Sequence, residues 1–300
     1  MQIQINTELL ASLYESEEIQ ALTSPKLKRI DSSSDRWYED EEGEKYLGAT
    51  SFVSLTQLAH ETKYLTYWRE QLLIELGSSD KVNEFVAATA NYGTVFHLAL
   101  ADLVKEGSIS QVAFVAKAKE RLQQFGFAGS DSVMLLALAD LVKDFASVVQ
   151  FFADKKTNGL EILAIELPVK SKLWGTATQI DLVLRIKGKI CLVNLKSSRK
   201  GSVPSHVQQL FIEKKCFVET FPQLAKDEIY CFILSPKDWC KKPTYDFKHH
   251  AQVDSPEMVE LMEAKLSLAQ AHGIMEHVKR NRVTLSEDFQ LFVEPKIEIL

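Results

Sequence analysis

Two short runs of β-branched and aliphatic residues, 179–186 and 189–194, are separated only by Lys187 and Gly188. This pattern predicts two antiparallel strands joined by a tight turn. Other segments must cover the apolar side chains of such a hairpin, so the rest of the chain has to pack around it. We therefore expect the stretch 166–198, which contains the hairpin, to organise the fold.

Polar side chains lie at one end of this hairpin. Asp181 is near the start of the first strand, and Asn194 and Lys196 are near the end of the second. Antiparallel pairing brings these positions to one edge of the sheet, and residues 194 and 196 share one face. A carboxylate pair there would bind Mg²⁺, and a nearby lysine could orient or deprotonate a water or neutralise phosphate charge. Such an arrangement is suited to phosphodiester hydrolysis. Taken alone, however, the pattern favours the alternative, an ordinary hairpin with a capping aspartate and a solvated lysine.

Length and composition indicate an ordinary globular chain. Its 300 residues are 46% apolar and 25% charged, which allows a large buried core. The formal charge of −6 argues against a generally basic protein that coats nucleic acid, so any DNA site has to be a local patch. The four cysteines are widely spaced and predict neither a zinc site nor a disulfide framework.

The beginning of the chain lacks the basic and apolar regions of a signal peptide. No apolar run reaches the roughly 20 residues that a membrane helix needs. We therefore expect a cytoplasmic protein with no membrane partner.

Hydrophobic periodicity separates a polar arm from a mainly helical part. We expect residues 1–35 to be a loosely packed arm, and residues 36–158 to be mainly helical after a small hairpin at 36–50. Thr50 or Ser51 is the expected N-cap of the first helix.

Residues 159–300 are expected to form an α/β core with a C-terminal helix. Ser205 is the expected N-cap of the helix that follows the hairpin. Together the parts predict one compact α+β domain, in which helices flank a mixed β-sheet. The expected elements besides the hairpin are strands at 160–167, 228–234 and 289–300 and helices at 205–221 and 256–271.

Three polar residues outside the hairpin extend the pattern. His97 lies in a helix with apolar neighbours, Glu166 ends the strand before the hairpin, and Gln209 lies in the helix after it. Each has an ordinary alternative explanation when taken singly, such as a buried core histidine or a surface glutamine. Glu166 is nevertheless placed where its carboxylate can face the same edge as Asp181.

Taken in order, the motifs resemble the PD-(D/E)XK nuclease superfamily, and within it the RecB-like and phage-type exonuclease branch. The resemblance covers roughly residues 36–235. It implies a restriction-endonuclease-like mixed β-sheet core flanked by helices, and DNA cleavage that depends on Mg²⁺ or Mn²⁺ and is often exonucleolytic. The segments that carry it are Gly93-Thr94-Val95-Phe96-His97, Glu166-Leu167-Pro168, Gly175 ahead of Asp181, Asn194-Leu195-Lys196-Ser197-Ser198 and His206-Val207-Gln208-Gln209, with Arg36-Trp37-Tyr38, 46–50 and Tyr67-Trp68-Arg69 similar to the lead-in of phage-type exonucleases.

The resemblance also implies a role for each matching residue. Lys196 would be the catalytic lysine beside the attacking water, and Gln209 would position that lysine or a DNA phosphate. The implied metal ligands are His97, Asp181, Asn194 and the backbone carbonyl of Leu195, with Glu166 supporting the metal shell. The implied catalytic residues are Asp181, Asn194, Lys196 and Gln209.

The chain departs from the family pattern at three places. Asn194 replaces an aspartate or glutamate, Glu213 stands where an aromatic residue is usual, and Gly175 is further from Asp181 than in the compact motif. An asparagine oxygen can coordinate Mg²⁺, but the side chain is neutral. Losing one close charge is worth several kcal/mol, so we expect catalysis to fall by about three or more orders of magnitude.

Basic residues near the proposed edge are candidate DNA contacts. They would hold phosphates without reading bases, and a solvated charged face is the alternative for each. The candidates are Lys196, Arg199, Lys200, Lys214 and Lys215, with Lys241 and Lys242 after the last core strand.

The leading hypothesis is a cytoplasmic, Mg²⁺- or Mn²⁺-dependent DNA exonuclease of phage or bacterial DNA processing, weakened or inactivated by Asn194. The alternative is a nuclease-like protein that binds DNA or a protein partner without cutting. A third reading is an assembly subunit with an accidental motif, which would be favoured if His97 and Asp181 were too far apart to share an ion. A protein partner or a homo-oligomer stays open.

Overall fold

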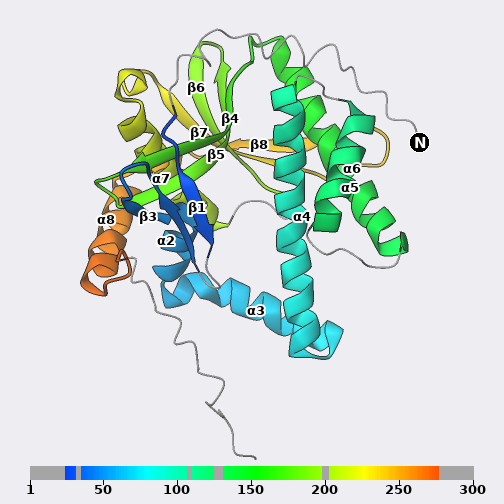
Figure 1. Ribbon diagram of the computed structural model, residues 1–300, viewed down its shortest axis with the longest axis horizontal. Coiled ribbons are helices and arrows are strands. Elements are labelled where there is room, and N and C mark those ends of the chain that lie inside the picture. Colours follow the sequence, from blue (N-terminus) through cyan, green and yellow to red (C-terminus); the bar gives the residue numbers. More distant parts are fainter. Residues whose placement is uncertain (1–23, 32–34, 107–109, 125–130, 198–202, 277–300) are drawn as a thin grey trace, which may run out of the picture.

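The structure is a computed structural model that describes residues 24–31, 35–106, 110–124, 131–197 and 203–276. An eight-stranded mixed sheet forms its centre, with helices on both faces (Figure 1). The expected α+β class, with a mixed sheet flanked by helices, is confirmed. The strands are β1 (Lys28–Asp31), β2 (Arg36–Glu39), β3 (Lys45–Gly48), β4 (Glu161–Ser171), β5 (Thr176–Ile186), β6 (Lys189–Leu195), β7 (Ile229–Pro236) and β8 (Tyr245–His249). The helices are α2 (Ala49–Leu55), α3 (Ala59–Leu76), α4 (Ser79–Glu106), α5 (Gln111–Gln124), α6 (Asp131–Lys156), α7 (Pro204–Thr220) and α8 (Pro256–Ala271).

Strand β5 lies at the centre of the sheet and has three neighbours. β4 runs antiparallel to it along its whole length, with Ser171 opposite Thr176. The other edge of β5 is shared, because β6 pairs antiparallel with residues 182–186 and β3 pairs in parallel with Thr176 and Ala177. This edge of β5 therefore has no strand partner between Ala177 and Leu182, because β3 ends opposite Ala177 and the pairing with β6 ends at Leu182.

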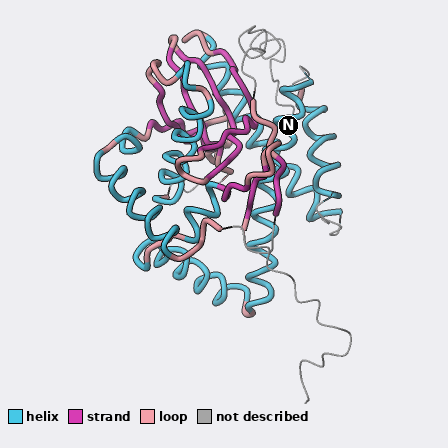
Figure 2. The backbone as a smooth tube through the Cα atoms, turned by 60° about the vertical axis from the view of Figure 1, so that its left-hand side comes forward, coloured by secondary structure: helices cyan, strands magenta, loops and turns pink. Residues whose placement is uncertain are grey.

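Two helical layers cover the sheet. Helices α4, α5 and α6 pack on one face, and α2, α7 and α8 pack on the other, so that the strands lie between helices in both views (Figures 1 and 2). Alternate residues of β6 feed the two cores, as expected when successive side chains of a strand point to opposite faces. Cys191 and Val193 join the first core, and Ile190 and Leu192 join the second.

The predicted hairpin is confirmed as β5 and β6. Lys187 and Gly188 connect the strands with φ angles of 53° and 75°. Positive φ at both central residues is the geometry of a two-residue turn whose twist matches that of the flanking strands. Gly188 adopts this conformation without the steric penalty that a side chain would bring.

The ends of several elements differ from the prediction. Helix α2 begins at Ala49 after Gly48, so neither Thr50 nor Ser51 is its N-cap; the Ser51 hydroxyl accepts the Arg36 backbone N–H at 2.7 Å instead. Helix α7 has Val203 as its N-cap rather than Ser205. Pro204 explains the shift, because a proline at the first helical position needs no hydrogen-bond acceptor for its nitrogen.

Two strands lie outside the predicted set. Residues 28–31 of the expected arm form β1, which pairs with β2, and residues 245–249 form β8, which pairs with β7. The rest of the arm before residue 24 and the strand expected at 289–300 lie outside the described residues. Within the described part of the chain, no helix is both long enough and apolar enough to cross a membrane.

Candidate metal centre

The two acidic residues of the predicted site lie opposite each other in the central strand pair. Ile165 pairs with Leu182, and Leu167 pairs with Ile180, so Glu166 and Asp181 occupy the positions between these pairs. Asp181 also borders the unpaired edge of β5, just beyond its last pairing with β6. The opening in the sheet gives a second element room to approach both carboxylates.

Both strands change the direction of their side chains at this point. Ile165 and Leu182 pack into the core under α4, whereas Leu167 and Ile180 pack into the core under α7. Residues two apart on a regular strand would share a face. In β4 this change of direction occurs at Glu166, whose φ of 50° is in the left-handed region. That conformation is uncommon for a residue with a side chain and is found most often at functional sites.

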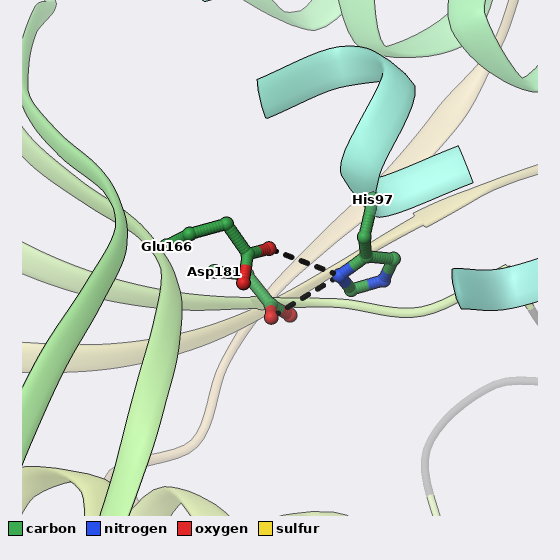
Figure 3. A group of neighbouring side chains, drawn as sticks. All are labelled: His97, Glu166 and Asp181. Carbon is green, nitrogen blue, oxygen red and sulfur yellow. Dashed lines mark ion pairs between the residues drawn. The ribbon is translucent and has the colours of Figure 1, made fainter. Parts of the chain in front are cut away.

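Helix α4 brings His97 to the two carboxylates from the neighbouring layer (Figure 3). His97 Nδ1 lies 3.2 Å from Asp181 Oδ1 and 3.5 Å from Glu166 Oε1. Within the described residues, these three side chains form a group whose ligand atoms lie within 4.8 Å of one another. We call His97, Glu166 and Asp181 the candidate metal centre.

The donor set of the candidate metal centre fits a small divalent cation. Two ligands at right angles lie about 3.0 Å apart when each is about 2.1 Å from an octahedral ion. The separations of 3.2 and 3.5 Å between His97 and its two partners need little adjustment to meet that geometry. Carboxylate oxygens suit Mg²⁺ and Mn²⁺, and an added imidazole favours Mn²⁺ over the harder Mg²⁺.

Electrostatics couple the three side chains. Burial by itself would lower the pKa of His97, but the carboxylates of Asp181 and then Glu166 outweigh it and raise that pKa to about 10. Burial would likewise raise the pKa of Asp181, but His97 and then Lys196 lower it. Without a cation, a protonated His97 therefore balances part of the negative charge.

The end of β6 contributes through its backbone. The Leu195 N–H donates to Asp181 Oδ2 at 2.6 Å and holds this carboxylate in place. The contact involves the amide nitrogen, so the role predicted for the Leu195 carbonyl stays a prediction. Lys196 follows at once, and its ammonium donates to Gln209 Oε1 on α7 at 3.1 Å.

A chain of hydrogen bonds continues from Gln209 into the core. Gln209 Nε2 donates to Glu213 Oε1 at 2.7 Å, and Asn194 Nδ2 donates to the same oxygen at 2.7 Å. Asn194 and Glu213 are both fully buried. Burial, followed by the nearby Asp181 carboxylate, raises the pKa of Glu213 to about 8. A cation close to this carboxyl would favour its ionised form.

In this series of hydrogen-bonded side chains, two oxygens lack hydrogen-bond partners among the described residues. They are Asn194 Oδ1 and Glu213 Oε2, and both are buried. Native proteins leave few buried polar atoms unpaired, and each such atom calls for an explanation. The sequence places Glu213 on the same helix face as Gln209 and marks it as a departure from the family pattern, but nothing in the local sequence places it against Asn194.

Gly93 lets α4 approach the segment after β6. A Cβ atom at Gly93 would lie 3.3 Å from Ser197 Oγ, which is tighter than ordinary van der Waals contact. Gly93 precedes His97 by one helical turn, so the close approach and the metal ligand lie on the same side of α4. Two motifs more than a hundred positions apart in the sequence therefore meet at the candidate metal centre.

The candidate DNA contacts are not all placed. Arg199 and Lys200 lie outside the described residues. Lys214 is engaged by the Ile229 carbonyl at 2.9 Å and by Asp254 at 2.6 Å, and the Lys215 ammonium lies over the Phe211 ring. Lys241 and Lys242 are exposed. The roles of these residues stay predictions.

An open groove of about 780 Å³ reaches the candidate metal centre at Glu166. One wall is the segment 24–28 and another is β4, with Lys26 and Lys28 among the lining residues. The sequence placed segment 24–28 in a loose arm, so this wall was not foreseen. Its position follows from the pairing of β1 with β2.

A scan against models of known protein families finds no match for this chain, and a search of curated proteins finds no similar sequence. The distance between His97 and Asp181 bears on the hypothesis of an assembly subunit with an accidental motif. His97 and Asp181 lie 3.2 Å apart, so the separation that would have favoured an accidental motif does not occur.

Proposed function

We propose that this protein is a Mg²⁺- or Mn²⁺-dependent DNA nuclease of the PD-(D/E)XK type, with a restriction-endonuclease-like core, and that it hydrolyses phosphodiester bonds from DNA ends. The observation that carries the proposal is the meeting of His97, Glu166 and Asp181 beside Lys196. These residues come from α4, β4, β5 and the segment directly after β6, and their order in the sequence is that of the family motifs. A solely structural cluster would not require that order.

The proposed roles follow from the contacts of each side chain. A bound Mg²⁺ or Mn²⁺ would polarise the phosphate and favour attack by water. His97, Glu166 and Asp181 would hold the cation, and the Leu195 N–H keeps the Asp181 carboxylate oriented. Gln209 restrains the Lys196 ammonium through one hydrogen bond, which leaves other N–H donors for a water or a phosphate oxygen.

A cleavage assay on linear single-stranded and double-stranded DNA with Mg²⁺ or Mn²⁺ tests this function. We expect cleavage by the wild-type chain and a loss of about a hundredfold or more in Lys196→Ala, the lower end of what a positioned proton-transfer group contributes. Lys189→Ala is the matched control, because Lys189 begins the same strand that Lys196 follows. If the wild-type chain cuts neither substrate with either cation, the proposed activity is wrong.

The amide at position 194 favours a second candidate, which is DNA binding without cleavage. A protein of this kind would bind DNA in a salt-dependent manner through phosphate contacts. Its affinity would be the same in EDTA and in Mn²⁺, and no product would form. Binding and cleavage measured on the same DNA therefore separate the two candidates.

A further inference from the structure

The side chains of Asn194 and Glu213 form a buried pair that the proposed catalytic residues do not explain. Asn194 lies on β6 and Glu213 on α7, and the Asn194 amide nitrogen donates to Glu213 Oε1 at 2.7 Å. In its ionised form, which a nearby cation favours, Glu213 accepts hydrogen bonds only, so the NH₂ group of Asn194 faces it. The orientation of the amide is thereby set, and Oδ1 is the atom directed away from Glu213.

The same carboxylate oxygen orients a second amide. Gln209 Nε2 donates to Glu213 Oε1 at 2.7 Å, which leaves Gln209 Oε1 to accept from Lys196 at 3.1 Å. Glu213 thus determines which end of each amide faces the site. With any other arrangement of these amides, Lys196 would lose its acceptor or Asn194 would present nitrogen in place of oxygen.

The strand register places Asn194 beside Asp181, which belongs to the candidate metal centre. Leu182 pairs with Val193, so Asp181 and Asn194 are the next residues on the two strands at this end of the hairpin. Asn194 Oδ1 and Glu213 Oε2 are buried and have no hydrogen-bond partner among the described residues. A cation beside Asp181, together with its water shell, would supply the missing partners.

We propose that Asn194 and Glu213 together replace the single carboxylate that the family motif has at position 194. Asn194 supplies the oxygen that faces the cation, and Glu213 is a positioning residue that orients this amide and restores the missing negative charge from helix α7. The proposal rests on the metal-dependent function above and assigns it one further residue.

Exchanging the charge between the two positions gives a sharp test. Glu213→Gln keeps the shape but removes the charge. Asn194→Asp would place a second carboxylate against Glu213 in a fully buried site, where like charges in contact repel strongly. The double variant Asn194→Asp/Glu213→Gln moves the charge back to β6 and again leaves one amide facing one carboxylate.

Calorimetric titration of the full-length, metal-free chain with Mn²⁺ measures the effect directly. Residues that orient metal ligands typically contribute about 10- to 100-fold in affinity. We expect Glu213→Gln and Asn194→Asp each to weaken Mn²⁺ binding by about tenfold or more, and the double variant to return to within about threefold of wild type. Glu219→Gln is the control on the same helix, since Glu219 contacts the β4–β5 turn and not the centre.

Three outcomes would overturn the proposal: a Glu213→Gln chain that binds Mn²⁺ as tightly as wild type, an Asn194→Asp chain that binds it more tightly, or a double variant whose loss is the product of the single losses. Unfolding of each metal-free variant by urea shows whether it is folded. Because the double variant again pairs one amide with one carboxylate, its rescue supports the proposal only where the folded single variants bind Mn²⁺ weakly; recovery of stability alone would show a structural role.

Failure of this proposal and failure of the nuclease function give different results. If the wild-type chain cuts DNA but Glu213→Gln binds Mn²⁺ normally, only the role of Glu213 is wrong. If Mn²⁺ binding follows the charge exchange but no DNA is cut, the role of Glu213 stands and the nuclease function is wrong. A wild-type chain that binds no Mn²⁺ refutes both.

Discussion

Two adjacent glutamines on α7 join two polar clusters of opposite character. Gln208 belongs to a cluster with Glu61 and Lys265, which we call the interhelix cluster because it links α7 to α3 and α8. Gln209 belongs to the hydrogen-bond chain beside the candidate metal centre. Both clusters are largely buried and contain carboxylate, amide and ammonium groups.

The interhelix cluster is balanced in charge and in hydrogen bonds. The Lys265 ammonium, whose side chain is 2% exposed, donates to Glu61 at 2.7 Å and to Gln208 at 2.9 Å. Gln208 in turn donates to the other oxygen of Glu61, and the Leu58 N–H at the start of α3 donates to Glu61 at 2.7 Å. One positive charge meets one negative charge.

The candidate metal centre with Asn194 and Glu213 is not balanced. It gathers three carboxyl groups, and two of its buried oxygens lack partners in the described part of the chain. A buried cluster with balanced charges and hydrogen bonds stabilises the packing of its elements, whereas buried oxygen atoms without hydrogen-bond donors are typical of a ligand-binding site. Substitutions should therefore affect stability in the first cluster and activity in the second.

The largest expected effect is at the candidate metal centre. Asp181→Asn should reduce DNA cleavage by about three orders of magnitude or more, because it removes a charged metal ligand. The free energy of unfolding should stay within about 1 kcal/mol of wild type, since active-site charges are often held at a cost in stability. Cleavage rates and urea unfolding check both statements, with the exposed Asp227→Asn as control. A large loss of stability with this substitution would remove the contrast between the clusters.

The interhelix cluster should show the reverse. Lys265→Met leaves Glu61 buried without its cation and should lower the free energy of unfolding by about 3 kcal/mol. Mn²⁺ affinity of the folded protein should not change. Lys63→Met on the exposed side of α3 is the control, with an expected effect within about 0.5 kcal/mol. A Lys265→Met protein as stable as wild type would show that the ion pair between Lys265 and Glu61 adds nothing to the free energy of unfolding.

The contact between Gly93 and Ser197 should give a smaller effect confined to activity. Gly93→Ala would press a methyl group against Ser197 Oγ and shift α4, so we expect cleavage to fall by about tenfold, or about 1.4 kcal/mol. The better helix propensity of alanine, about 1 kcal/mol, should offset the strain in stability. Gly93→Ala/Ser197→Ala removes the obstructing oxygen and should regain most of the activity. If the double variant stays as slow as the single one, the close approach is not the cause.

The smallest expected effect is a pH dependence of the interhelix cluster. Burial would raise the pKa of Glu61, but its hydrogen bonds to Lys265 and the Leu58 N–H lower it overall. The contribution of Glu61 is therefore complete above its unfolded pKa of about 4.3 and is lost as pH falls through its lower folded pKa. Urea unfolding between about pH 3 and 6 should show a shallower acid slope in Lys265→Met than in wild type. Equal slopes would contradict this assignment.

Local patterns in the sequence predicted much of the sheet and the positions of the candidate ligands. Alternation and a glycine turn located β5 and β6, and the polar residues at their ends followed from antiparallel pairing. The same patterns missed β1 and β8, which are short edge strands. They also misplaced the start of α7 by overlooking the preference of Pro204 for the first helical position.

The sequence by itself determined the hairpin, the alternation of its core residues and the order of the motifs, because strand period and turn chemistry act between near neighbours. Only the tertiary structure decided which buried polar groups face one another. Glu213 is 19 positions from Asn194, and Glu61 is 204 positions from Lys265, yet each pair is in contact. Such partners depend on how helices pack across a twisted sheet, and hydrophobic periodicity records which face of a helix is buried without recording what lies against it.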